Sequence, residues 1–237
     1  MNLAYMNLGF GLTDLVALLF FISCWLAYHY FLDNPREGKP SLNILMNDYR
    51  IAWMRQMFPR ENRIVDTTIS ASLQNGTAFF ASTSLLALGA TLTLLRSSNE
   101  FISIFADIAF IEPPTKAGWE IKVIGLAVIF AYAFFKFAWS YRLFNYCSIL
   151  IGATPQRECK NETDIKNALH RASSMNIVAG RHFNRGQRAF FFALAYLGWF
   201  ISPWLFMVTT GASLYAMWHR QFASDALHSL TDLSKIP

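Results

Sequence analysis

The sequence predicts an all-α, multi-pass integral membrane protein with four transmembrane helices, forming a single membrane domain over residues 1–237. Composition is the first observation that predicts it: 54% of the residues are hydrophobic and only 15% are charged, whereas about a quarter of the residues of a soluble protein are charged. The second is that the apolar residues form a few long blocks. The third is that Lys and Arg alternate between the segments that connect those blocks.

Four apolar blocks are long enough to cross a hydrocarbon layer about 30 Å thick, which takes roughly 20 helical residues. Backbone groups inside lipid must pair internally, so each block is expected to be an α-helix. Pro203 is expected to kink the fourth. A shorter apolar run at 101–111 cannot span and is expected to be interfacial or re-entrant. The four blocks cover about 12–32, 72–95, 121–140 and 189–218.

The orientation follows from the Lys and Arg residues outside the blocks. None precedes the first block, six separate the first two, two follow the second, seven lie from Arg157 to Arg188, and two follow the last. Because basic residues stay inside, both termini are predicted outside a bacterial inner membrane, with segments 33–71 and 141–188 in the cytoplasm. No Lys or Arg precedes Arg36, so the first block is expected to be a retained span rather than a signal peptide.

The cytoplasmic segments are predicted to contain amphipathic helices. After Ser41, a plausible N-cap, apolar residues recur at helical spacing from Leu42 to Met57. Two placements stay open: the helix lies on the inner leaflet, or it packs against the cytoplasmic ends of the spans. A second helix is predicted at 163–183.

Two ionisable residues inside the blocks are candidate functional residues, because a charge in a bilayer is costly. Asp14 is close to the outer end of the first block and is interpreted as interfacial. Lys136 approaches the cytoplasmic leaflet along the third block, and its ammonium is expected to snorkel to the head groups.

The second block has an unusual polar face that includes Asn75, Thr77, Ser84 and Thr91, the last three spaced by seven residues. Small and hydroxyl-bearing residues allow close helix contacts within a bundle or between protomers. The alternative is a pore lining, which requires several copies of the chain around an axis.

A basic run precedes the fourth block. Arg181, Arg185 and Arg188 share one helix face, and His182 belongs to the same run. At the inner leaflet such a face is expected to bind anionic head groups, and a dedicated anion site is the alternative. This distribution indicates that the net charge of +5 serves binding to lipid head groups rather than to nucleic acid.

No motif for catalysis or metal binding is present. The sequence lacks GxSxG, HExxH, P-loop and GxGxxG patterns, and its three cysteines include no CxxC pair. The predicted topology puts the histidines on opposite sides of the membrane without ligand spacing. A non-enzymatic protein without metal or cofactor is therefore expected.

Two strings resemble a known family. NGTAFFASTSLLALG at 75–89 and RHFNRGQRAFFFALA at 181–195, with Gly198-Trp-Phe after them, are similar to the membrane-protein family called domain of unknown function 599. The similarity extends from about Thr13 to Arg220. It implies a multi-pass bacterial inner-membrane protein and carries no known activity.

Two functional hypotheses follow. The first is a non-enzymatic oligomeric or accessory subunit whose basic cytoplasmic face binds lipid and whose partners are other membrane subunits or further copies of itself. The second is a small homo-oligomeric channel or transporter, with anions as its cargo.

Overall fold

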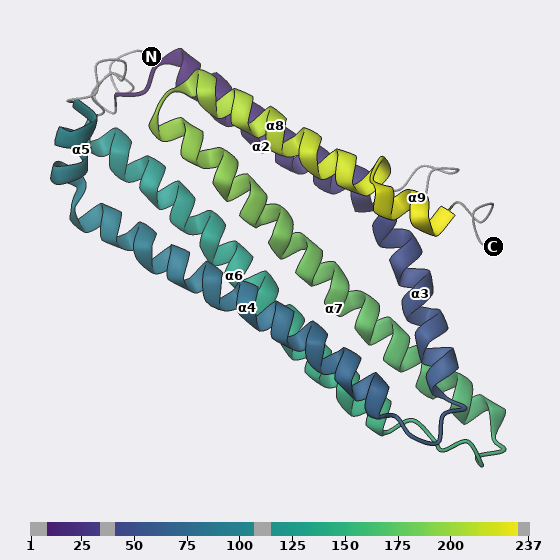
Figure 1. Ribbon diagram of the computed structural model, residues 1–237. Helices are drawn as coiled ribbons and strands as arrows, with labels where there is room; N and C mark the ends of the chain where they lie inside the picture. The colour runs from purple at the N-terminus through teal and green to yellow at the C-terminus, as the bar shows by residue number, and fades with distance from the viewer. Residues whose placement is uncertain (1–8, 34–40, 107–114, 232–237) are drawn as a thin grey trace. The chain divides into compact units, whose positions relative to one another are not determined.

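The computed structural model describes residues 9–33, 41–106 and 115–231 (Figure 1). Every regular element within these ranges is helical, which confirms the all-α prediction for this part of the chain. The elements are α2 (Leu12–Asp33), α3 (Leu42–Met57), α4 (Ile64–Arg96), α5 (Ser98–Ala106), α6 (Lys116–Gly152), α7 (Glu162–Tyr196), the short 3-10 helix η1 (Leu197–Phe200), α8 (Pro203–Phe222) and α9 (Asp225–Thr231).

Within the described ranges, three helices are long and apolar enough to cross a membrane, namely Leu12–Leu32 within α2, and the whole of α4 and α6. They contain the first three predicted blocks. The 33 residues of α4 and the 37 of α6 correspond to about 50 and 55 Å, so both helices are longer than a hydrocarbon layer is thick. Helix α5 covers the start of the apolar run predicted at 101–111, and the part of that run after residue 106 lies outside the described residues.

The predicted fourth span, 189–218, is not one helix. Its first part is the end of α7, η1 and a turn follow, and Pro203 begins α8 instead of kinking a continuous helix. Figure 1 shows the chain reversing direction between α7 and α8. The reason is local: the Ser202 hydroxyl accepts a hydrogen bond from the Leu205 amide at 3.1 Å, as an N-cap does, and proline is favoured at the first position of a helix.

The reversal is stabilised by a side-chain hydrogen bond, and it brings the backbone at Gly198 close to α8. The Thr209 hydroxyl donates to the Ala195 carbonyl oxygen at 2.7 Å, which joins α8 to the end of α7. A Cβ at Gly198 would lie 2.6 Å from the Thr209 hydroxyl oxygen and 3.1 Å from the Leu205 carbonyl oxygen. Only glycine leaves space for this contact.

The chain divides into two compact units. Helices α4, α6 and α7 each contribute residues to both units. Unit 1 is Met1–Arg36, Ser84–Tyr132 and Arg188–Arg220; unit 2 is Glu37–Thr83, Ala133–Gln187 and Gln221–Pro237. The core of unit 1 is mainly aromatic. Phe206 stacks on Trp199 with ring centroids 5.2 Å apart, and it contacts Phe21 and Tyr196 at 5.0 and 5.3 Å.

Unit 2 packs α3 against α6 and α7. Met54 and Met57 of α3 are fully buried in one cluster with Cys147 and Ile151 of α6 and Ala172 of α7. Of the two placements that the sequence left open for the helix at 42–57, this packing favours the one against other helices. The helix predicted at 163–183 forms the first part of α7, which runs on without a break through residue 196.

Candidate functional site

The predicted basic run lies on α7, where Arg181 is exposed and His182, Arg185 and Arg188 are half-buried. Within unit 2, burial and then the positive charges of Lys136, Arg185 and Arg181 lower the pKa of His182 below its usual value. The structure therefore brings Lys136 of α6 together with three members of the run. Arg188 belongs to unit 1, where it interacts electrostatically with Tyr28 of α2.

Unit 2 also contains a half-open cavity of about 260 Å³. Residues of α3, α4, α6 and α7 line it, with one arginine, several amides and hydroxyls, and an apolar wall. The lining residues are Leu42, Asn43, Met46, Asn47, Arg50, Ser72, Leu73, Gly76, Thr77, Phe144, Gly180, Phe183 and Asn184.

Arg50 is the charged residue of this cavity. Its Nη1 donates to the carbonyl oxygen of Asn176 at 3.1 Å and to the side-chain oxygen of the same residue. The described residues place no carboxylate within ion-pair distance of it. Burial lowers the pKa of Arg50 from its usual value, but a guanidinium remains protonated in proteins. The cavity therefore contains a positive charge without a counter-ion from the described chain.

A glycine of α7 makes room for this arginine. A Cβ at Gly180 would lie 2.8 Å from the Arg50 guanidinium carbon. Four residues along the same helix, Asn184 donates from its amide to the Asn43 side-chain oxygen at 3.0 Å. The predicted basic run thus contributes an amide to the cavity, although its arginines do not line it.

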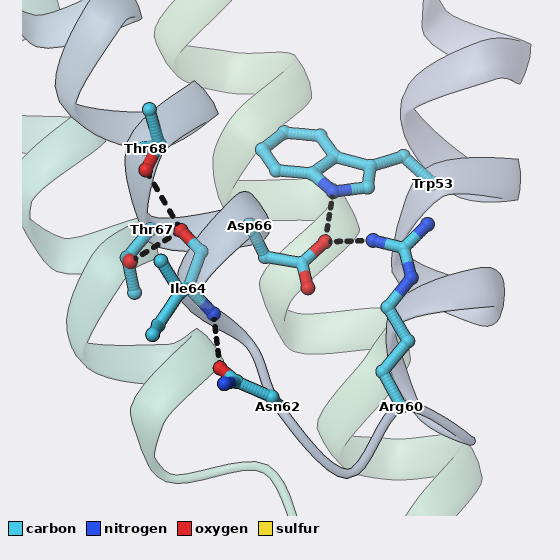
Figure 2. A network of polar contacts seen from close by, with 7 residues as sticks. All are labelled: Trp53, Arg60, Asn62, Ile64, Asp66, Thr67 and Thr68. Carbon is cyan, nitrogen blue, oxygen red and sulfur yellow. Dashed lines mark hydrogen bonds and ion pairs between the residues drawn. The ribbon is translucent and has the colours of Figure 1, made fainter.

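Two arginines and an aspartate fix the connection between α3 and α4, and with it the position of α3 beside the cavity. The fully buried Asp66 accepts hydrogen bonds from Trp53 Nε1 at 2.7 Å and from Arg60 Nη1 at 2.5 Å (Figure 2). Its second oxygen has no hydrogen-bond partner among the described residues. Arg63 donates to three carbonyl oxygens at the end of α6, those of Ile151, Thr154 and Pro155, where helix carbonyls otherwise lack partners.

Comparison with known proteins identifies the family. A family model described as a protein of unknown function, DUF599, matches residues 16–226, which is most of the chain. The chain belongs to the DUF599 family. A search of curated proteins and a search of solved structures each gave no match. Membership confirms the resemblance seen in the two sequence strings, and the family description assigns no activity.

In this DUF599 protein the predicted polar face of α4 divides into two parts. Thr77, Ser84 and Thr91 are buried, as is Ser70, whereas Asn75 is exposed. The hydroxyls of Thr77 and Thr91 donate to carbonyl oxygens one turn earlier in their own helix, at 2.7 Å each. Burial agrees with a helix contact inside the chain, and the pore lining stays a prediction that no described feature favours.

In unit 1 of this DUF599 protein, Asp14 has a partner that sequence reasoning did not single out. Its Oδ1 lies 3.7 Å from the Lys122 ammonium and accepts a hydrogen bond from Trp199 Nε1 at 2.7 Å. Lys122 also donates to the Trp199 carbonyl oxygen at 2.9 Å. Both charged side chains are only 13% exposed. The sequence signal that could have found this ion pair was Lys122 itself, a lysine at the second position of the apolar block predicted at 121–140.

Metal binding has no candidate site in the ranges that the structure describes, because they contain no group of three or more His, Cys, Asp or Glu side chains that can hold an ion. The chemistry that these ranges offer a ligand is that of cations and amides: the cluster around His182 and the cavity of Arg50.

Proposed function

We propose that this protein is a non-enzymatic integral membrane protein of the bacterial inner membrane, an oligomeric or accessory subunit whose basic cytoplasmic face binds anionic lipid head groups. Three helices of sufficient length and apolarity support the membrane location. Only 11% of the most apolar window of α4 is buried inside the chain, so that helix has surface available for lipid or for a neighbouring subunit.

The observation that carries the lipid-binding part is the cluster of Lys136, Arg181, His182 and Arg185. The electrostatic partners that lower the pKa of His182 are all cations. The cluster lies near the inner ends of two predicted blocks, 121–140 and 189–218, which is head-group depth in the proposed orientation. Each basic residue near an anionic membrane surface contributes about 1 kcal/mol of attraction.

The chain reversal at 197–202 changes the proposed topology. Helix α8 has 20 residues, about 30 Å, which is the length of a return crossing, although it is less apolar than the three helices above. Tyr28, near the end of α2, interacts with Arg220 near the end of α8, which supports ends at a common depth. We therefore propose five crossings, with the N-terminus outside and the C-terminus in the cytoplasm rather than outside.

The positive-inside pattern agrees with five crossings. The turn at 197–202 contains no Lys or Arg, and the two basic residues after it, Arg220 and Lys235, move to the cytoplasmic side. Fusion of a reporter to the C-terminus tests this. Green fluorescent protein should fluoresce there and alkaline phosphatase should be inactive; an active phosphatase would restore the four-crossing topology.

Lipid binding is tested with the full chain in nanodiscs of phosphatidylglycerol and phosphatidylcholine, by native mass spectrometry of the retained lipids and of the oligomeric state. Replacing Arg181 and Arg185 by Gln should lower the preference for phosphatidylglycerol by about 30-fold, because it removes about 2 kcal/mol of attraction. The matched control replaces two exposed basic residues of the same cytoplasmic segment, Lys160 and Arg171, by Gln. An equal loss in both double variants would contradict a localised basic face.

A further inference from the structure

We propose that the cavity beside Arg50 is a specific site for the phosphate group of one anionic phospholipid of the cytoplasmic leaflet. This inference rests on the proposed function, because it requires that unit 2 lies at the inner membrane surface. It goes further by separating one defined site, with one ligand per chain, from the general attraction of the basic cluster.

The charge of the cavity argues for an anion. Among the described residues, Arg50 makes hydrogen bonds only through Nη1, to the two oxygens of Asn176. The N–H groups of Nε and Nη2 remain for a ligand, and together they form the fork that binds two oxygens of a phosphate. A half-buried guanidinium without a counter-ion has lost part of its hydration, and a bound phosphate would supply that counter-ion.

The polar lining suits a phosphate ester. Asn43, Asn47 and Asn184 bring amides to the cavity, and Ser72 brings a hydroxyl. Amides and hydroxyls both donate to phosphate oxygens and accept from alcohol groups, such as those of a glycerol head group. Thr77 contributes less as a donor, because its hydroxyl already donates to the Leu73 carbonyl oxygen.

The depth of the cavity argues for a lipid rather than a solute. Its lining residues stand at the inner ends of three predicted blocks: Ser72 begins the second, Phe144 follows the third by one turn, and Asn184 precedes the fourth by five residues. These positions correspond to the head-group layer. The volume of about 260 Å³ is just below the range of roughly 300–1,000 Å³ for drug-sized ligands, so it suits a head group and not an entire lipid.

The apolar wall provides a place for the start of the acyl chains. It consists of Leu42, Met46, Leu73, Phe144 and Phe183. A free inorganic anion would gain no free energy from contact with this wall. The glycerol and first methylene groups of a phospholipid would lose water by packing against it.

The experiment uses the full chain purified in mild detergent after exchange into nanodiscs with one part phosphatidylglycerol to four parts phosphatidylcholine. Native mass spectrometry counts the phosphatidylglycerol molecules that remain after stepwise delipidation. The wild type should retain one per chain. Arg50→Gln should lower its retention about tenfold or more, because it removes a charge-assisted hydrogen-bonding pair. Arg55→Gln removes the same charge from an exposed position on the same helix and should keep the lipid.

Three further samples make each outcome decisive. The variant in which Gln replaces both Arg181 and Arg185 should lose loosely bound lipid and keep the last molecule, which separates this inference from the basic face. Ser72→Leu blocks the rim from an exposed position, so it should lose the lipid even if Arg50→Gln does not fold. Adding inorganic phosphate should displace little lipid. Retention by folded Arg50→Gln, retention by Ser72→Leu, or saturable binding of inorganic phosphate without the lipid would each overturn the proposal.

Discussion

Replacing Asp66 by Ala should destabilise the protein by about 3 kcal/mol. The Asp66 carboxylate is fully buried, holds Trp53 and Arg60, and connects α3 to the start of α4. A hydrogen bond that involves a charged group contributes about 1.5–3 kcal/mol. The ion pair with Arg60 contributes little beyond that, because the Arg60 side chain is 39% exposed and is partly screened by water. The indole N–H of Trp53 would be left without an acceptor, which adds to the cost.

The assay is thermal unfolding of the full chain in detergent, followed by tryptophan fluorescence. For a chain of this size each kcal/mol corresponds to roughly 2–4 °C, so the midpoint should fall by about 6–12 °C. Asp66→Asn keeps an acceptor for Trp53 and should lose less than half as much. A surface control, Glu158→Ala, changes an exposed carboxylate outside the helices and should move the midpoint by under about 2 °C. If Asp66→Ala unfolds like that control, the carboxylate does not hold the connection.

Three other predictions concern different parts of the molecule. Lys122→Met should lower the free energy of unfolding by about 3–5 kcal/mol, because it leaves the Asp14 charge unpaired. Adding Asp14→Asn should restore part of this stability in a double-mutant cycle. Additive effects of the two substitutions would contradict the pairing. The pKa of His182 in the folded chain lies below 6.5, so the unfolded chain binds the proton more readily. The contribution of His182 to stability should be complete above about pH 6.5 and should be lost as the pH falls towards the folded pKa. His182→Gln should flatten this pH dependence of the unfolding midpoint. Gly198→Ala should lower the midpoint because its methyl group meets the Leu205 carbonyl oxygen, whereas Gly152→Ala, where a Cβ meets nothing within 4 Å, should not; equal midpoints would argue against the tight reversal.

The sequence predicted the long helices because their signals are local. An apolar block of sufficient length in lipid has only the helix available, and the stripe from Leu42 to Met57 has the period of a helix; α2, α3, α4 and α6 follow these patterns. The reversal at 197–202 was missed because both sides of it are apolar, so hydropathy alone does not mark it. Ser202-Pro203, an N-cap followed by a favoured first residue, was the signal that could have found it.

The site was predicted only in part, because its contacts are not local. The basic run at 181–188 was visible as a sequence pattern. Arg50, by contrast, bonds Asn176, 126 residues away, and a single sequence gives no sign of that pairing. The Asp14–Lys122 pair likewise joins two helices that are distant in the chain, and only Asp14 was noticed as a charge within an apolar block.

The close approach of Arg50 to Gly180, together with a second one at Gly186, has a consequence for helix α7 itself. Gly180 and Gly186 lie in its interior, where each glycine costs about 1 kcal/mol relative to alanine because the unfolded backbone is so free. A methyl group at the first would meet Arg50, and one at the second would lie 2.7 Å from the Phe137 ring. This part of α7 therefore has a low intrinsic helix propensity. Its helical form depends on the neighbours that the glycines admit, so a peptide covering only these residues would be largely unstructured in water.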